Sequence, residues 1–497
     1  AQEMTVRLQN RLKEILEKSE GCRVMGIGLE GGLAPYVDRG EYELPELRLW
    51  AMMKQTIEDC GFRPGIDVAI ALDPALSELE IAYREEFDLP ESIGMYLFWR
   101  DHSKKVMDRD AVLAIYEKAI FDYDIPILSI EDGFSEDDME GWHKLLAKLG
   151  DRVLVVGDDL VTTNDRTIER SARQGEINSV LVKAYLIGSL YETLLAVLVT
   201  LGKGLNLIIS HRSKSPNDDM EAHIALATNA LGLKAGGGAN TERLVKYQAV
   251  TTQMERILEK HVQEPELPGF ATLERLRARE EPTNAGIPTV GVDVQLALPG
   301  AEPESRVRLS FHGATPLGTS SGTGEAVHLV DAVFERAEFL EAVDGNRKLL
   351  QEVEPGLFTF DPSVTREQVK SIDDKALLDL FDRSGRYEGK GCLNAVDHVH
   401  EFIAPLFENR NVADWGLFEV DHALLQLELA TAKRRGKLDD DADAESETYC
   451  MQHKQNLGMN GILSVSLAMA RGIAHVRGQE LYEFLREEML VIIEHLA

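Results

Sequence analysis

The sequence predicts a two-part α/β fold, in which a (β/α)₈ barrel is followed by a separate α+β domain with an antiparallel meander and helices. Over residues 1–262, short apolar runs alternate with amphipathic stretches, which is typical of a parallel sheet covered on both faces. Each run stops at a polar or ionisable side chain, and such a barrel has its active site at the carboxyl ends of its strands. From residue 290 onward, apolar and polar residues alternate, which indicates strands with one buried face.

Seven apolar runs are expected to be barrel strands, each followed by the residue given in parentheses. They are 24–28 (Glu30), 67–72 (Asp73), 125–130 (Glu131), 153–157 (Asp158), 179–182 (Lys183), 207–210 (His211 and Arg212) and 233 (Lys234). The stretches at residues 47–57 and 139–149 are expected to be two of the helices between them. Because a closed barrel of this type has eight strands, one strand near the beginning is missing.

A change of composition divides the chain. Residues 264–270 contain Pro and Gly and are interpreted as a linker, so that residues 1–263 form the barrel domain and residues 271–497 the second domain. The alternating runs at 290–296 and 306–309 are joined through Pro299 and Gly300, which predicts a meander or hairpin with one buried face. Helices are expected at 394–405 and 460–471, and the basic run 433–437 is interpreted as a solvated loop.

Composition restricts the partners and the compartment. The chain of 497 residues has 53 Lys and Arg against 85 Asp and Glu, a net charge of −32. This excess of acid argues against nucleic acid as the main partner, because phosphate contacts need clustered basic residues. No run of about 18 apolar residues predicts a membrane span, and the opening residues have no signal-peptide pattern. The four cysteines lack CxxC spacing, so free thiols in the reduced cytoplasm are expected.

Three carboxylates at successive strand ends suggest a metal site. Asp73, Glu131 and Asp158 would converge in a barrel and would repel one another unless a cation neutralises them. Mg²⁺ prefers carboxylate oxygens and keeps positions for water or substrate. The alternative is that these are three unrelated helix-capping acids. Their succession along the chain favours the metal site.

Cationic side chains are found at the ends of the later predicted strands. Lys183 and Lys234 follow two of them, with His211 and Arg212 on the strand between. A lysine crowded by other cations has a lowered pKa and can act as a base, whereas an isolated one would extend its ammonium to solvent. Acids facing two lysines and a phosphate-binding arginine predict proton abstraction beside a substrate carboxylate, with metal ions neutralising the enolate.

Many segments resemble motifs of the enolase family. Those in the first part are 30–35 (EGGLAP), 129–134 (SIEDGF), 157–164 (GDDLVTTN), 181–190 (LVKAYLIGSL) and 210–213 (SHRS). Those in the second part are 286–290 (GIPTV), 320–326 (SSGTGEA), 389–391 (GKG), 403–405 (IAP), 457–460 (LGMN) and 465–468 (VSLA). The order resembles a circularly permuted enolase, with the TIM-like barrel domain before the α+β domain that precedes it in the family.

The resemblance implies dehydration of 2-phosphoglycerate, a small phosphorylated carboxylate, to phosphoenolpyruvate in glycolysis, by a homodimer with two Mg²⁺ in each active site. Asp73, Glu131 and Asp158 would hold the first ion. Ser320 would help to hold the second ion together with the substrate phosphate.

The resemblance also implies the catalytic roles. Lys183 would be the base that takes the C2 proton, and Lys234 would bind the substrate carboxylate. Glu30 would lie by the leaving hydroxyl, with His211 nearby. The phosphate would be bound by Arg212 and Ser213.

The sequence departs from the family in several places. The family's opening barrel segment, with its own His and Glu, is absent, which accounts for the missing strand. Residues 214–216 and 237–240 differ from the family loops, and residues 332–383 resemble nothing in it. Two alternatives therefore stay open beside an enolase: an enolase-like paralogue for another phospho- or phosphono-carboxylate, and a non-catalytic binding protein with this fold.

Overall fold

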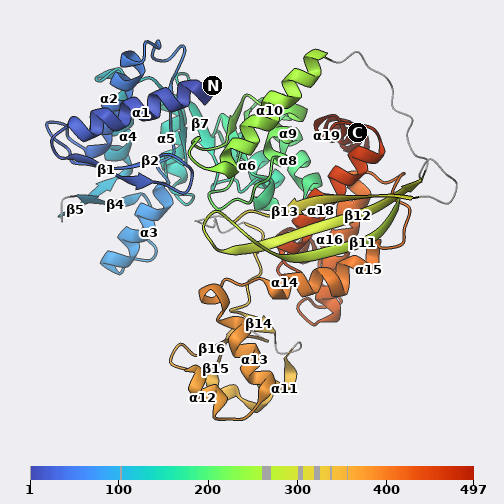
Figure 1. The fold of residues 1–497 in the computed structure, drawn as a ribbon. Helices are drawn as coiled ribbons and strands as arrows, with labels where there is room; N and C mark the ends of the chain where they lie inside the picture. The colour runs from blue at the N-terminus through green and yellow to red at the C-terminus, as the bar shows by residue number, and fades with distance from the viewer. Residues whose placement is uncertain are drawn as a thin grey trace.

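The computed structural model describes residues 2–100, 103–259, 270–299, 306–317, 325–335, 339–354 and 356–496. In these ranges the first part of the chain is α/β and the second part is α+β (Figure 1). The predicted fold class is confirmed. Residues 264–269 of the expected linker lie outside the described residues.

A curled sheet of parallel strands forms a half-barrel. In the described part of the chain its strands are β3 (Ile70–Leu72), β6 (Ile127–Glu131), β7 (Leu154–Gly157), β8 (Ser179–Val182), β9 (Asn206–Ser210) and β10 (Gly232–Lys234). Their order is β10-β9-β8-β7-β6-β3, with every neighbouring pair parallel. All residues of β8 are buried, because both faces of the sheet are covered. Six of the seven predicted strands are therefore confirmed.

The first apolar run does not join this sheet, so its prediction as a barrel strand is wrong. It forms β1 (Cys22–Ile27), which pairs antiparallel with β2 (Leu33–Val37). The chain reverses because the Gly28 amide donates to the carbonyl of Gly32 at 2.8 Å and the Gly31 amide donates to Gly28 at 2.9 Å. Gly31 has φ +79°, a conformation that favours glycine.

The first part of the chain also contains helices. They are α1 (Gln2–Lys18), α2 (Pro45–Asp59), α3 (Leu76–Phe87), α4 (Arg109–Phe121), α5 (Met139–Leu149), α6 (Asp165–Gln174), α7 (Ala184–Ile187), α8 (Leu190–Gly202), α9 (Met220–Thr228) and α10 (Thr241–Glu259). The helices expected at 47–57 and 139–149 are thus confirmed as α2 and α5. On α5, Trp142, Leu145 and Leu149 are buried, which is the spacing of one helical face. A hairpin of β4 (Met95–Arg100) and β5 (Ser103–Asp108) was not predicted.

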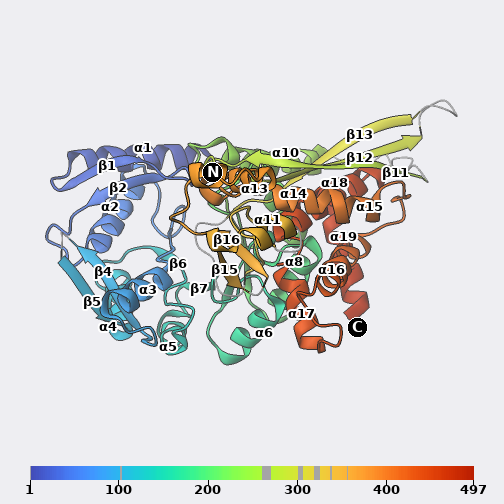
Figure 2. The same cartoon turned by 90° about the horizontal axis from the view of Figure 1, so that it is seen from below.

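The second part is built on an antiparallel sheet of β11 (Thr272–Pro282), β12 (Pro288–Pro299) and β13 (Arg306–Ala314). Val290, Val292, Val294 and Leu296 are buried on one face, as the alternation predicts. Figure 2 shows helices against that face, with α18 contacting β12 and β13. The helices are α14 (Leu393–His398), η3 (Val399–Ile403), α15 (Ala404–Phe407), α16 (Leu417–Arg434), α17 (Ala444–His453), α18 (Met459–Val476) and α19 (Leu481–Leu496).

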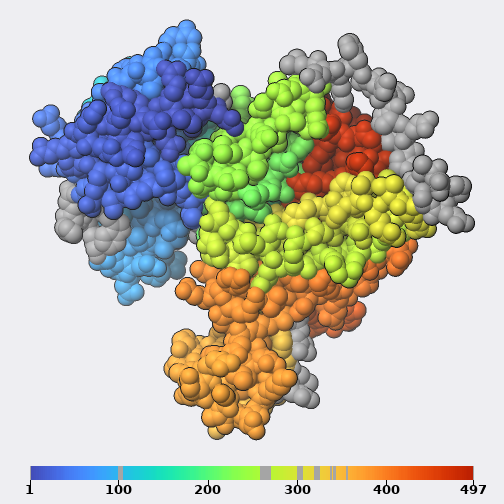
Figure 3. All heavy atoms as spheres, in the orientation of Figure 1, coloured from blue at the N-terminus to red at the C-terminus, as the bar shows by residue number. Residues whose placement is uncertain are grey.

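A small lobe, defined as residues 334–384, projects from the second part (Figures 1 and 3). Its elements are β14 (Phe334–Glu335), α11 (Leu340–Gly345), η1 (Arg347–Leu349), β15 (Leu350–Glu354), β16 (Leu357–Phe360), α12 (Arg366–Lys370) and α13 (Lys375–Ser384). Its strands form a separate sheet of order β14-β16-β15. Phe334, Val343 and Phe358 belong to a hydrophobic core of its own. The short segment η2 (Arg386–Gly389) follows it.

The interpretation of residues 433–437 as a solvated loop is wrong for Lys433 and Arg434, which end α16, and for Arg435. The side chain of Arg435 is only 10% exposed and donates to Glu335 of the lobe at 2.5 Å. Lys437 pairs with the same carboxylate. This segment therefore attaches the lobe to the end of α16. Over the described ranges, no helix has both the length and the apolar character needed to cross a bilayer.

Candidate active site

A cavity of about 140 Å³ lies at the carboxyl ends of the parallel strands. Its lining residues are Glu30, Asp73, Ala75, Asp132, Asp158, Asp159, Lys183, Ser210, His211, Arg212, Ser213, Lys234 and Glu325. Parallel strands end at the same edge of a sheet, which is why side chains distant in sequence meet here. Ser320, the remaining predicted contact to metal and phosphate, lies outside the described residues.

Lys234, at the end of β10, joins two of the predicted metal ligands. Its Nζ lies 2.7 Å from Asp73 Oδ2 and 2.7 Å from Glu131 Oε2. Burial disfavours the charged ammonium, but these two carboxylates outweigh burial and raise the pKa of Lys234. Burial and the charges of Asp73 and Asp158 raise the pKa of Glu131 to about 8. The carboxylates crowd one another, as expected for a site that attracts cations.

Lys183 directly follows β8 and points into the cavity. Its ammonium donates to Asp158, and its side chain is 17% exposed. Its backbone amide donates to Thr163 Oγ1 at 3.0 Å, which fixes the chain where β8 ends. Burial opposes the charge of Lys183, but Asp158 and Glu131 together raise its pKa. Lys183 is therefore protonated in this structure.

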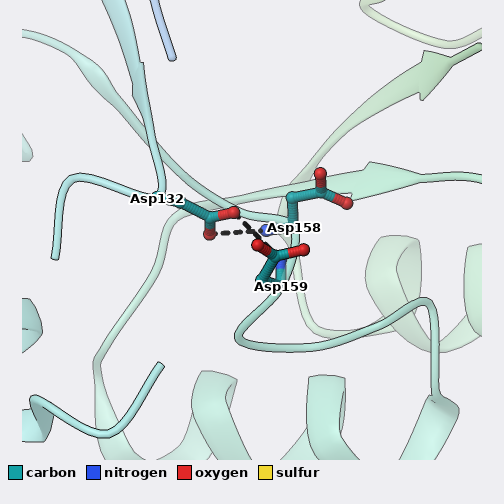
Figure 4. Close-up of side chains that lie close together, drawn as sticks. All are labelled: Asp132, Asp158 and Asp159. Carbon is teal, nitrogen blue, oxygen red and sulfur yellow. Dashed lines mark hydrogen bonds between the residues drawn. The ribbon is translucent and has the colours of Figure 1, made fainter. Parts of the chain in front are cut away.

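Three aspartates form the carboxylate cluster that the described residues offer to a metal ion. Ligand oxygens of Asp132, Asp158 and Asp159 all lie within 4.8 Å of one another. Asp132 is directed at the backbone of the next strand's end, where its two oxygens each accept an amide, from Asp158 and from Asp159, at 3.0 Å (Figure 4). The cluster differs from the predicted trio, because Asp73 and Glu131 instead surround the ammonium of Lys234.

The donor set fits Mg²⁺ on chemical grounds. The side chains offer hard carboxylate oxygens, which this ion prefers. Asp158 belongs both to the cluster and to the predicted trio, and it is 4% exposed. Within the described ranges its Oδ1 is a buried oxygen with no hydrogen-bond partner, and such an atom is costly unless something binds it.

Glu30 and His211 form a second pair in the cavity. His211 Nε2 lies 3.4 Å from Glu30 Oε1, and its Nδ1 lies 2.8 Å from the carbonyl oxygen of Lys234. Both ring nitrogens thus face acceptors, an arrangement that suits the imidazolium form. Burial lowers the pKa of His211, which opposes that form. The hydrogen bond from His211 lowers the pKa of Glu30 to about 2, so Glu30 is ionised.

Arg212 and Ser213 follow β9, and Arg243 of α10 holds their backbone. The guanidinium of Arg243 donates to the carbonyl oxygen of Arg212 at 2.9 Å and to that of Ser213 at 2.6 Å. The Arg212 side chain is paired with Glu325 from the second part of the chain, and each is 7% exposed. Arg212, the arginine predicted to bind phosphate, is therefore held by residues from both parts of the protein: its backbone by Arg243 and its side chain by Glu325.

Four charged residues in or beside the cavity were not assigned a role from the sequence. They are Asp132, Asp159, Arg243 and Glu325. Three of them stand inside or beside recognised motifs, Asp132 in 129–134, Asp159 in 157–164 and Glu325 in 320–326. Arg243 lies on α10, outside the recognised motifs. It donates to backbone carbonyls, and backbone groups have no signature in the sequence.

Acids and lysines converging at the carboxyl ends of the strands place the protein in the class of TIM-type barrels, whose active sites lie at this edge of the sheet. The family model described as "Enolase, C-terminal TIM barrel domain" matches residues 1–269, which is more than half of the 497 residues. The chain belongs to this enolase family. The match covers the half-barrel and all lining residues of the cavity except Glu325, and it indicates enolase-type catalysis.

Proposed function

We propose that the protein is a Mg²⁺-dependent enolase that interconverts 2-phosphoglycerate and phosphoenolpyruvate. The observation that supports this most directly is the placement of Lys183 and Lys234 in one small cavity with the carboxylates of three successive strands. The reaction needs a base beside C2 and positive charge around the substrate carboxylate. Both are provided by residues that end strands of one sheet.

Lys234 and Arg212 would orient the substrate from two sides. Lys234 would exchange its contacts to Asp73 and Glu131 for the substrate carboxylate. Arg212, with Ser213, would bind the phosphate through charge-assisted hydrogen bonds. Two anionic ends held by two separate cations would leave C2 and C3 between them.

Lys183 would move the C2 proton. Its ammonium is the acid form of the base, and this is the form that returns a proton to C2 when phosphoenolpyruvate is hydrated. In the forward direction Lys183 must first give up that proton, because only the free amine can accept one. The raised pKa caused by Asp158 must therefore be reduced when the site is loaded.

Glu30 and His211 would assist departure of the C3 hydroxyl. Ionised Glu30 can accept a hydrogen bond from that hydroxyl, and a proton on His211 Nε2 can pass to the leaving oxygen through Glu30.

Asp73, Glu131 and Asp158 would hold one Mg²⁺, and Ser320 would contribute to a second. The ions, when bound, would supply the positive charge that stabilises the enolate. The cluster of Asp132, Asp158 and Asp159 supports an ion near the end of β7.

The wider assignment is also a proposal. The order of motifs supports a circular permutation, and the family supports a glycolytic role in the cytoplasm and a homodimer. The domain division at residues 263 and 271 rests on the sequence pattern.

Formation of phosphoenolpyruvate from 2-phosphoglycerate, followed by its ultraviolet absorbance, tests the proposal. We expect turnover that EDTA abolishes and Mg²⁺ restores. Lys183→Ala should lower kcat by roughly 10²–10⁴-fold, the range expected for loss of a general base. Lys148→Ala, an exposed lysine on α5, serves as the matched control and should match the wild type.

Other results would contradict the assignment. Turnover only with a different phospho- or phosphono-carboxylate would identify a paralogue. Mg²⁺-dependent binding of 2-phosphoglycerate without turnover would identify a binding protein.

A further inference from the structure

Glu325 reaches the cavity from a segment whose backbone is fixed by the surrounding fold. We call residues 325–331 the strap. The Ala326 amide donates to the Leu186 carbonyl at 2.9 Å, so the strap is bound to α7, directly after Lys183. The Val327 amide donates to His453 at 2.7 Å, and the Val327 carbonyl accepts from Met459 at 2.9 Å. These bonds set where the Glu325 side chain can reach.

The carboxylate of Glu325 is paired with the guanidinium of Arg212, the arginine predicted to bind phosphate. Both side chains are 7% exposed, and Arg212 Nη2 donates to Glu325 Oε2. A guanidinium has five N–H donors in a fixed plane, so a carboxylate on one terminal nitrogen fixes the plane while using only part of the donors. Arg243 already holds the Arg212 backbone at 2.9 Å. Arg212 is thus held at both ends.

Glu325 is the carboxylate that pairs with the Arg212 guanidinium among the described residues. His328, on the strap, is neutral, because burial and the charge of Arg212 lower its pKa to about 3. Without Glu325, the buried Arg212 guanidinium would lose the carboxylate that fixes its plane toward the cavity.

We propose that Glu325 is a positioning residue that holds the Arg212 guanidinium toward the cavity. The second part of the chain thereby completes the phosphate subsite of the half-barrel. This inference rests on the proposed function for the identity of the substrate, but not for the binding of phosphate. In the competing role, Glu325 occupies Arg212 and is displaced by phosphate, so that removing its charge would leave phosphate binding unchanged or make it tighter.

The test measures the affinity of the full chain for inorganic phosphate by calorimetry, in wild type, Glu325→Ala, Glu325→Gln and Arg212→Ala. The exposed Glu91→Ala is the matched control. We expect Glu325→Ala to weaken phosphate binding about tenfold or more, and Glu325→Gln, which keeps the length without the charge, to weaken it less. Arg212→Ala should abolish binding, and adding Glu325→Ala to it should change nothing further.

Steady-state kinetics separate positioning from general damage. With 2-phosphoglycerate, Glu325→Ala should raise KM while kcat falls less, because phosphate contacts act in the ground state and the transition state alike. The thermal midpoint of Glu325→Gln should match that of Glu91→Ala, so the Gln variant decides if the Ala variant does not fold. Unchanged or tighter phosphate binding in Glu325→Gln would overturn the inference. Absence of turnover in the wild type, with the phosphate results as expected, would refute only the proposed function.

Discussion

Replacement of Lys454 should destabilise the protein by several kcal/mol. Lys454 is 0% exposed, and its ammonium donates to the Ile187 carbonyl at 2.7 Å, to Glu192 Oε2 at 2.8 Å and to the Gln452 carbonyl at 3.1 Å. It comes from the second part of the chain and binds the segment that follows Lys183. Lys454→Met would fill the space but leave Glu192 without its counter-charge.

The size of the expected stability loss follows from the contacts that Glu192 keeps when Lys454 is replaced. Its side chain is 12% exposed, and it keeps a hydrogen bond from Ser189 Oγ at 2.7 Å. Removing one partner of such a buried pair costs about 3–5 kcal/mol. If Glu192→Gln is added, the stranded charge is gone. The double variant should therefore be less destabilised than the sum of the single variants, by about 1–3 kcal/mol.

The penalty should depend on pH. Burial raises the pKa of Glu192, so the folded state binds this proton more tightly than the unfolded state. The stranded carboxylate can take up a proton in acid, and the cost of Lys454→Met should therefore be smaller at pH 5 than at pH 8. Urea unfolding of the wild type, both single variants and the double variant at the two pH values measures these quantities. Additivity within about 0.5 kcal/mol, or equal cost at both pH values, would refute the reasoning.

Two further changes test packing and a buried acid. Gly237→Ala would place a Cβ 2.4 Å from the Gly31 carbonyl oxygen, and we expect a loss of about 1–3 kcal/mol in urea unfolding, whereas Gly26→Ala, with nothing within 4 Å, should cost far less. Equal costs would contradict this. Burial raises the pKa of Asp421 from 3.8 to about 7, so between these pH values the carboxyl ionises in the unfolded chain but stays protonated in the folded protein, and stability falls as pH rises. Asp421→Asn should gain relative to wild type by up to about 1.4 kcal/mol per pH unit between about pH 4 and 7, and a constant difference would disprove the assignment.

The ends of the barrel strands could be predicted because an apolar run stops there and an ionisable side chain follows it. The run before Lys183 is buried on both faces, and the run before Glu131 is buried except at Leu128, so each is largely apolar and stops abruptly at a functional side chain. The run before Glu30 looks the same in the sequence. Its pairing is decided by a glycine turn and by contacts distant in sequence, which a local pattern does not contain.

Contacts between the two parts of the chain were the least predictable. Glu325 is separated from Arg212 by 113 residues, and nothing in the spacing links them. Arg243 acts on backbone carbonyls, which have no sequence signature. The lobe was recognised only as an unfamiliar stretch, although Phe334 and Phe358 form part of a core of their own.

One short segment of the chain connects the cavity to the lobe. Glu325 enters the cavity and Glu335, ten residues later, is clamped by Arg435 and Lys437 at the base of the lobe. The strap between these two glutamates is hydrogen-bonded along its backbone to the rest of the fold. The carboxylate that contacts Arg212 and the attachment point of the lobe therefore belong to one segment that its surroundings hold in place.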